Sequence, residues 1–285
     1  MPEGPEIRRA ADRIAKVLAG KSLEDVWFGL PRLARFSEEI CGWRVLDVDT
    51  YGKALLIRLD GGLSLYAHNQ LYGVWYVRER GRWPKTRRSL RVALHTESHS
   101  ALLYSATDIS LLTPEEELFH PYLSRLGPDV LDPLLTWRDV SRRLNRPRFR
   151  NRSLGSLYLD QGFLAGIGNY LRSEILFAAG LHPANKPREF AVKTRNRLAR
   201  QTQIIARRAY ETGGITNAPE CVAAMREAGV NRRHYRFAVF ARAGKPCLNC
   251  GAAIERIDVG SRRLYLCPTC QASCLGADPE VEISR

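Results

Sequence analysis

The first six residues, Met-Pro-Glu-Gly-Pro-Glu, place a proline and a carboxylate where both could take part in chemistry. Pro2 is small enough to permit removal of Met1, which would leave a free secondary amine with Glu3 beside it. Such an amine attacks aldehydes and acetals and forms a Schiff base. Its reference pKa is about 8, below that of lysine, so a fraction is neutral at working pH. We therefore predict a nucleophile at Pro2; the alternative is an ordinary helix that has prolines at its start.

A helix is expected directly behind this amine. Pro5 suits the first helical position, apolar residues recur at helical spacing over residues 7–18, and Gly20 ends the pattern. If the amine lies near the positive end of the helix dipole, its protonated form is disfavoured and its pKa falls further.

The cysteines indicate a metal site. Four of the seven form two Cys-x-x-Cys pairs separated by sixteen residues, namely Cys247, Cys250, Cys267 and Cys270. In a cytosolic chain, this pattern favours metal binding over disulfides. Four thiolates can close a tetrahedral zinc site that has no open position, so the zinc is expected to be structural. The residues between the pairs are typical of two strands around a turn that carries arginines.

Two further stretches could contact a ligand. Lys53 precedes an apolar strand-like run, where it is either a solvated edge charge or a cationic donor that points into a groove. The loop at residues 68–73 carries Gln70, Leu71 and Tyr72. Leu71 and Tyr72 either pack into a sandwich or form a wedge that enters a base stack and fills the gap left by an extruded base.

Two stretches in the second half of the chain suit phosphate. Six arginines and no acid lie within residues 142–152, which suggests a phosphate-contacting strip or a solvated charged face. Residues 157–176 are typical of helix, turn, helix, with a glycine-rich turn at 165–169 and Asn169 as the expected N-cap. Amides at such a helix start can bind a DNA phosphate.

The composition limits the classes of partner that the protein is expected to bind. The formal net charge is +14 over 285 residues, and the sequence pI is about 9.8. This excess favours a polyanion, with nucleic acid ahead of a membrane surface. No apolar run is long enough to span a bilayer, and charged residues stand where a signal peptide needs an apolar core. We therefore expect a cytosolic protein.

The pattern of the chain predicts an α+β multidomain protein. Short strand-like runs after the first helix suggest a β-sandwich or barrel. They lie at residues 23–28, 45–49, 54–59, 63–68, 73–77, 90–96 and 101–105. Residues 127–133 are rich in turn formers and read as a linker. We expect an N-terminal β-sandwich with flanking helices at 1–126, a helical DNA-binding domain at 134–228, a zinc ribbon at 235–271 and a flexible tail at 272–285.

These parts, in this order, resemble the formamidopyrimidine-DNA glycosylase/endonuclease VIII family. The shared features are the Pro-Glu-Gly-Pro-Glu start, a helix-two-turn-helix with Gly-Ile-Gly-Asn-Tyr, and a four-cysteine ribbon with an arginine turn. The resemblance extends to about residue 271. Residues 68–75, 127–133 and 159–176 look specifically like the bacterial endonuclease VIII branch, which acts on oxidised pyrimidines.

The resemblance implies a role for each of the residues already singled out. Pro2 is the nucleophile that attacks C1′ of a damaged nucleotide, and Glu3 is the acid that helps to release the base, with Glu6 in support. Lys53 assists β-elimination, and Arg262 grips phosphates and serves δ-elimination. The DNA-contacting positions are Gln70, Leu71, Tyr72, Arg125 and Asn169. The partner is damaged double-stranded DNA, and the protein is expected to be a monomer associated with the bacterial nucleoid.

The sequence departs from the family pattern at two positions. Tyr51 stands where a basic residue is expected before Gly-Lys, which weakens a phosphate contact. Arg263 follows Arg262 in place of a small residue or proline, so either arginine could reach the lesion. Two alternatives remain: a glycosylase of the same fold directed at purines (8-oxoguanine or formamidopyrimidine), and a zinc-ribbon DNA-binding protein without catalytic activity.

Overall fold

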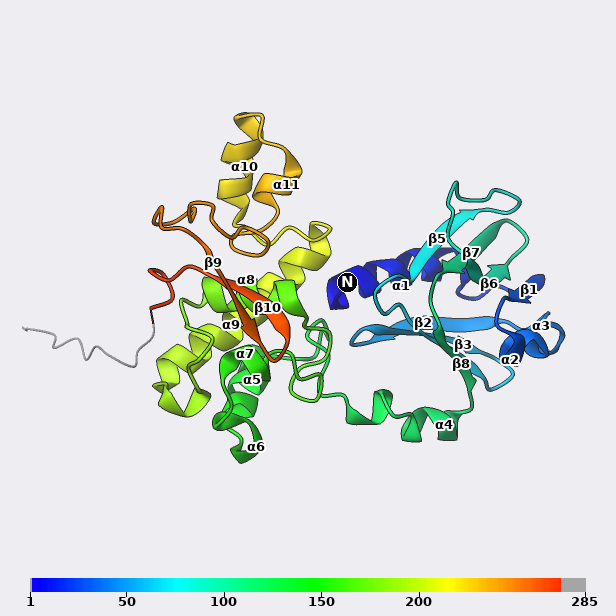
Figure 1. Ribbon diagram of the computed structural model, residues 1–285. Helices are drawn as coiled ribbons and strands as arrows, with labels where there is room; N and C mark the ends of the chain where they lie inside the picture. Colours follow the sequence, from blue (N-terminus) through cyan, green and yellow to red (C-terminus); the bar gives the residue numbers. More distant parts are fainter. Residues whose placement is uncertain (1, 273–285) are drawn as a thin grey trace, which may run out of the picture. The chain divides into compact units, whose positions relative to one another are not determined.

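The computed structural model describes residues 2–272, and the chain forms two compact units, Met1–Asp129 and Val130–Arg285 (Figure 1). The predicted flexible tail at 272–285 lies outside the described residues, except for residue 272. Cys274 lies outside them as well. The predicted boundaries of the separate domains stay a prediction.

The first unit begins with α1 (Gly4–Leu18), whose buried residues repeat at helical spacing along one face. The helix starts one residue before Pro5. It ends where Gly20 adopts a φ of 74°, a left-handed conformation that glycine accepts without strain. Four short helices lie elsewhere in this unit: α2 (Pro31–Ala34), α3 (Phe36–Glu39), α4 (Pro114–Phe119) and the 3₁₀ turn η1 (Leu123–Arg125).

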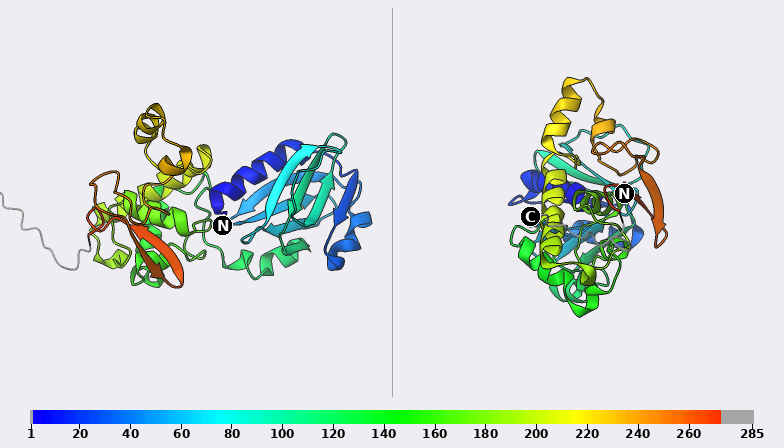
Figure 2. Two further views of the ribbon diagram at one scale, coloured as in Figure 1. Left: turned by 45° about the horizontal axis from the view of Figure 1, so that its top comes forward. Right: turned by 90° about the vertical axis from the view of Figure 1, so that its left-hand side faces the viewer.

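Two antiparallel four-stranded sheets make up the body of the first unit (Figures 1 and 2). One has the order β2-β3-β4-β8 and the other β1-β6-β7-β5. The strands are β1 (Asp25–Phe28), β2 (Val45–Tyr51), β3 (Ala54–Leu59), β4 (Ser64–His68), β5 (Val74–Glu79), β6 (Leu90–His95), β7 (His99–Tyr104) and β8 (Asp108–Leu112). Side chains from both sheets and from α1 share one apolar core, so the predicted β-sandwich with flanking helices is confirmed.

The second unit is mainly helical. Its long helix α9 (Val192–Glu211) packs against α5 (Trp137–Leu144) and α8 (Asn169–Ala178). The remaining helices are α6 (Pro147–Arg150), α7 (Leu154–Leu157), η2 (Pro187–Glu189), α10 (Pro219–Glu227) and α11 (Arg232–Tyr235).

The helix-two-turn-helix differs in detail from its prediction. The first helix, α7, ends at Leu157, where the prediction had it begin, and turns occupy most of the chain as far as α8. Gly168, rather than Asn169, is the N-cap of α8, and Asn169 is its first helical residue. Gly168 has the extended backbone of a cap, with φ −130° and ψ −155°. Asn169 therefore presents its side chain from inside the first turn.

The C-terminal ribbon is a hairpin of β9 (Glu255–Val259) and β10 (Arg262–Leu266). Gly260 and Ser261 form its tip, both with φ near 60°, which is the twist that two-residue hairpins favour. Arg262 therefore opens the second strand, opposite Val259. Leu264 and Leu266 of β10 are buried in the same apolar core as the helices.

Candidate active site

The amino terminus is built around a buried carboxyl group. Pro2 is half-buried, and Glu3 is only 3% exposed as the N-cap of α1. The Glu6 carboxylate accepts a hydrogen bond from the Glu3 backbone N–H at 3.0 Å. Glu6 therefore fixes the backbone of Glu3, the residue predicted to be the acid.

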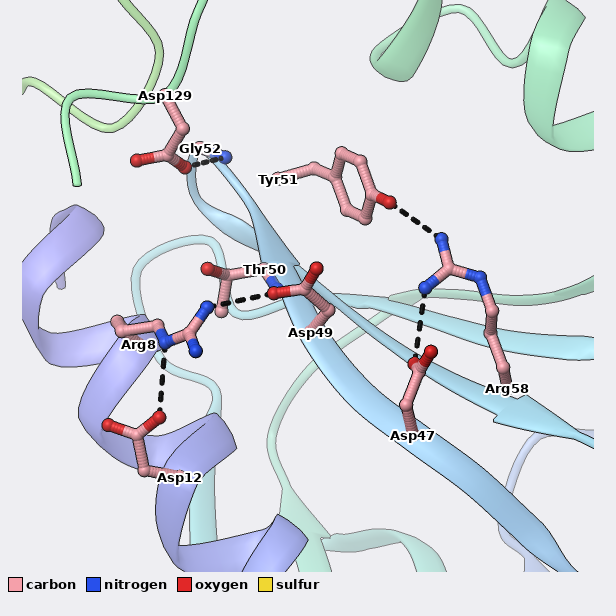
Figure 3. A network of polar contacts seen from close by, with 9 residues as sticks. All are labelled: Arg8, Asp12, Asp47, Asp49, Thr50, Tyr51, Gly52, Arg58 and Asp129. Carbon is pink, nitrogen blue, oxygen red and sulfur yellow. Dashed lines mark hydrogen bonds and ion pairs between the residues drawn. The ribbon is translucent and has the colours of Figure 1, made fainter. Parts of the chain in front are cut away.

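Arg8 ties the first turns of α1 to the neighbouring sheet (Figure 3). Its guanidinium bonds Asp12 one turn along the helix at 3.0 Å and Asp49 of β2 at 2.8 Å. At the other end of the helix, the Gly20 N–H bonds the carbonyl of Val45 at the start of β2. The helix therefore runs alongside β2, and its start lies at the end of the strand where the β2–β3 turn follows. The turn carries Lys53, so Pro2, Glu3 and Lys53 gather at one end of the first unit.

Two residues that the sequence analysis missed hold the turn around Lys53. The Asp129 carboxylate accepts a hydrogen bond from the Gly52 N–H at 2.7 Å (Figure 3). The Tyr122 hydroxyl accepts one from the Lys53 N–H at 3.0 Å. Burial raises the pKa of Tyr122 to about 12, so its hydroxyl stays protonated at neutral pH. Asp129 falls within a stretch that its composition marked only as a linker.

The structure changes the interpretation of Tyr51. Its hydroxyl accepts a hydrogen bond from Arg58 at 2.7 Å, and the guanidinium carbon lies 5.5 Å from the centre of the Tyr51 ring (Figure 3). Arg58 also pairs with Asp47 at 3.1 Å. A positive group is therefore present beside position 51 although the residue itself is not basic.

The loop predicted to be a wedge is exposed. Leu71 is 55% and Tyr72 is 67% exposed, which disfavours the alternative in which both pack into the sandwich. Gln70 has a left-handed backbone with φ 50°. The loop closes through a 2.7 Å bond from the Gly73 N–H to the Asn69 carbonyl. A Cβ atom on Gly73 would lie 2.6 Å from that oxygen, so the close approach requires glycine.

Three neighbours hold the wedge residues in place. Arg88 donates to the Tyr72 carbonyl at 2.6 Å, and Thr107 donates to the Gln70 side-chain oxygen at 3.0 Å. His68 Nδ1 accepts the Gln70 N–H at 3.2 Å, which requires that nitrogen to be deprotonated. Burial and then the charge of Lys53 lower the pKa of His68, against the opposing charge of Asp108.

Arg125, another predicted DNA-contacting residue, lies exposed at the end of η1.

In the second unit, a buried arginine links Asn169 to the zinc ribbon. Arg172 of α8 is fully buried, and its guanidinium donates to the carbonyl of Arg263 at 3.0 Å and to that of Arg262 at 3.4 Å. It also reaches the Asn169 side-chain oxygen at 3.5 Å. The side chains of Arg262 and Arg263 are both exposed. One guanidinium thus fixes the start of β10 relative to Asn169.

A second buried charge on α8 fixes the chain that leads to the ribbon. The Glu174 carboxylate accepts backbone N–H bonds from Ala238, Val239 and Phe240 at 2.8–2.9 Å, and the Thr216 hydroxyl also donates to it. Both Arg172 and Glu174 are charged residues within the predicted helix-turn-helix. That was the available sequence signal, because a charged side chain that is buried needs hydrogen-bond partners inside the protein. Neither residue was predicted from that signal.

Part of the predicted arginine strip has an internal role. Arg143 donates to the carbonyls of Gly162 and Phe163, and Arg152 pairs with Asp160. These two arginines therefore stabilise the turns before α8, because they satisfy groups there that lack helical partners. The strip as a whole is a weaker phosphate-binding candidate than its sequence indicated.

The four predicted metal ligands converge in the ribbon. The sulfur atoms of Cys247, Cys250, Cys267 and Cys270 all lie within 4.8 Å of one another. The Cys247–Cys270 and Cys250–Cys267 sulfur pairs are 3.9 and 3.4 Å apart. A tetrahedral zinc with bonds of about 2.3 Å places its sulfurs about 3.8 Å apart. The donor set therefore fits one structural zinc.

The chain matches three family models in sequence order. They are the formamidopyrimidine-DNA glycosylase N-terminal domain at residues 1–108, the formamidopyrimidine-DNA glycosylase H2TH domain at 126–219, and a zinc finger found in FPG and IleRS at 244–272. Proteins named Endonuclease 8 from Escherichia coli and Shigella sonnei are each 48% identical over 274 residues. Each match spans 95% of this chain and 100% of the relative.

The chain belongs to the formamidopyrimidine-DNA glycosylase/endonuclease VIII family.

Solved structures agree on the fold. Lactococcus lactis Fpg bound to DNA with an abasic site superposes with a TM-score of 0.77, covering 95% of this chain and 100% of that one at 19% identity. The same protein bound to DNA containing N7-benzyl-Fapy-dG gives the same values. As a member of this family, the chain is a DNA-binding enzyme, a DNA glycosylase and AP lyase, with one structural zinc. Among residues 2–272, no helix has the length and apolar character needed to cross a membrane.

Proposed function

We propose that this enzyme removes oxidised pyrimidines from duplex DNA and cleaves the strand through a Schiff base at Pro2. The observation that carries the proposal is the buried Glu3 carboxyl, which adjoins Pro2 at the end of the unit where the turn with Lys53 also lies. A secondary amine beside a buried carboxyl group suits attack on an acetal carbon.

The proposed reaction starts at C1′ of the damaged nucleotide. The Pro2 nitrogen bonds to C1′, Glu3 donates a proton that helps to open the sugar, and the bond to the base breaks. The resulting iminium acidifies the C2′ proton. Loss of that proton expels the 3′ phosphate in β-elimination, assisted by Lys53. Arg262 grips the phosphates and serves the second, δ-elimination, and hydrolysis of the iminium frees Pro2.

The remaining site residues are proposed to hold the DNA. The target base must leave the duplex before Pro2 can reach C1′. Gln70 would bond the orphaned base, and Leu71 and Tyr72 would fill the gap. Arg125 and Asn169 would contact phosphates, with Asn169 presented by the first turn of α8.

The preference for pyrimidines rests on the relatives and on the wedge. The relatives at 47–48% identity are named Endonuclease 8. Gln70, Leu71 and Tyr72 are contiguous in one exposed loop, as in the endonuclease VIII branch. We further propose that the protein acts as a monomer in the bacterial cytoplasm, on DNA of the nucleoid.

Borohydride trapping tests this function. Borohydride reduces the iminium and leaves a covalent protein–DNA adduct, which we expect with duplexes that carry 5-hydroxyuracil or thymine glycol more than with 8-oxoguanine. A protein that keeps Met1 has no free Pro2 amine and should not trap, and Pro2→Gly should trap more slowly. Trapping at the normal rate by protein that retains Met1 would eliminate Pro2 as the nucleophile. Preferential trapping on 8-oxoguanine would assign the enzyme to the purine branch instead.

A further inference from the structure

The end of β5 and the connection that leads from it to β6 are strongly basic, and none of the predicted site residues lies there. Residues 78–88 hold one acid, Glu79, and six cations that are all exposed: Arg78, Arg80, Arg82, Lys85, Arg87 and Arg88. We call residues 78–88 the basic loop. It also carries Trp83, which is 55% exposed.

The sheet topology directs the basic loop back toward the wedge. β5 and β6 both run antiparallel to β7, and their first residues, Val74 and Leu90, pair with the same residue, Tyr104. The chain must therefore return along the whole length of β5 before β6 can begin. Figure 1 shows this connection in cyan beyond β5.

Two contacts fix the path of the loop. At its middle, the Trp83 ring lies against the ring of His95, with centroids 6.0 Å apart. His95 follows the core residue Leu94 in β6, so it faces away from the sandwich core. Near its end, Arg88 bonds the carbonyl of the wedge residue Tyr72. The basic loop thus passes over the outer face of the sheet and ends at the wedge.

Some of the cations in this loop are engaged within the protein. Arg82 pairs with Glu79 at 3.0 Å, and Arg80 donates to the Thr96 carbonyl at 3.1 Å. Within residues 2–272, Lys85 and Arg87 make no hydrogen bond and no ion pair. Two exposed cations that have no partner, in a segment attached to the wedge, suit phosphates of a duplex that the wedge enters.

We propose that the basic loop is a second DNA-contacting surface, in which Lys85 and Arg87 bind backbone phosphates of the duplex beside the wedge. The proposal rests on the proposed function, because it is the wedge that brings DNA to this side of the unit. If the loop only covered the outer face of the sheet, the charges of Lys85 and Arg87 would have no effect on DNA affinity.

The test compares two variants of equal charge in the full-length zinc-loaded protein. One is Lys85→Gln with Arg87→Gln. The control is Lys16→Gln with Lys21→Gln, two exposed lysines at the far end of α1, about 20 Å of helix from Pro2. Fluorescence anisotropy on an undamaged labelled duplex gives Kd across a range of chloride concentrations. Each lost phosphate contact lowers the salt slope by about 0.9, so the loop variant should lose about 1.8 and bind more weakly.

The outcomes separate this proposal from the proposed function. The control should keep the wild-type slope and Kd. An unchanged slope in the loop variant, or an equal reduction in both variants, would overturn the DNA-contacting role of the loop. Borohydride trapping of the wild-type protein on an abasic duplex is measured in parallel. If the wild type traps while the slopes do not differ, the basic-loop proposal alone fails, and if it does not trap, the Schiff-base function fails.

Discussion

At the scale of single residues, Glu3 is held where an acid can donate a proton without competition from water. Its side chain is almost fully buried, and its backbone is fixed by Glu6. Glu3→Gln keeps the shape and removes the proton. We expect base excision to fall by about a hundredfold or more, the usual scale of general acid catalysis.

The same variant carries its own control. Cleavage of a preformed abasic site needs no glycosidic step, so Glu3→Gln should retain most of that activity. Single-turnover rates on a lesion duplex and on an abasic duplex measure the two activities side by side. Equal losses on both substrates would show that Glu3 is not specific to base release.

His68, which holds the wedge residue Gln70, is expected to make the stability of the protein depend on pH. Because burial and Lys53 lower its pKa, the folded protein resists a proton that the unfolded chain accepts below about pH 6.5. The unfolding free energy should therefore fall as pH drops from 7 to 5. His68→Asn, which cannot take up that proton, should show a smaller fall.

Urea unfolding at several pH values measures this difference. His95 also has a pKa lowered by burial, but it is present in both proteins, so its effect cancels in the comparison. Identical pH dependence in the two proteins would mean that His68 does not carry the effect.

The spacing of the four cysteines predicted the cluster that the structure shows, because such pairs have few uses, while the acid at Glu3 and the amine at Pro2 stay predictions from residue type. The residues that position Lys53 and Gln70 could not be predicted in the same way. Asp129, Tyr122 and Thr107 act through contacts that join strands and turns far apart in the chain. Only the folded chain brings these pairs together.

At the scale of elements, a variant of the wedge loop can show whether Leu71 and Tyr72 contact DNA or serve packing. Leu71→Ala with Tyr72→Ala should slow excision from duplex DNA by about tenfold, since stacking on a base contributes about 1–3 kcal/mol. Single-stranded abasic DNA has no gap to fill, so its cleavage should change much less. Because both side chains are more than half exposed, the melting temperature should change little.

Leu118 and Phe119 of α4 provide a matched control for this pair. They are also adjacent and apolar, and they are 72% and 75% exposed in the same unit. Their replacement by alanine should leave both cleavage rates unchanged. A wedge variant that loses both rates equally, together with several degrees of melting temperature, would indicate that the loop serves packing.

The zinc is expected to stabilise the helical core of the second unit as well as the ribbon that binds it. Cys267→Ser should lower the zinc content and the DNA affinity. Since Leu264 and Leu266 lie in the helical core, it should also lower the stability of the second unit while the sandwich stays folded. Mass spectrometry of bound metal and thermal unfolding measure the two effects.

Cys221→Ser is the control for this change, because Cys221 is half-buried in the same unit and lies outside the metal cluster. It should keep one zinc per chain. Full zinc occupancy in Cys267→Ser would contradict the proposed ligand set.

Local patterns predicted most elements of the sandwich, but two details escaped them. β8 is short and only partly buried, and it lies at the edge of its sheet, so its alternation is weak. The predicted start of α8 was shifted by one residue, because Asn is preferred over Gly as an N-cap by residue type. The backbone angles of Gly168 decide between them.

At the scale of the whole molecule, net charge overstates how many cations are available to DNA. Arg143, Arg172 and Arg242 donate to backbone carbonyls inside the second unit. The charge of +14 correctly predicted a polyanionic partner. It could not indicate which arginines face that partner, because a carbonyl inside the protein and a phosphate outside attract the same donors.

We do not expect the ribbon alone to be exchangeable between members of the family, because residues outside it hold it in place. Its hairpin is held by Arg172, and the chain leading to it is held by Glu174, and both residues belong to α8. A chimera that received only residues 235–271 from another family member would keep these bonds only if the new backbone followed the same path against Arg172 and Glu174. As sequences within the family diverge, we therefore expect substitutions in α8 and in the ribbon to occur together.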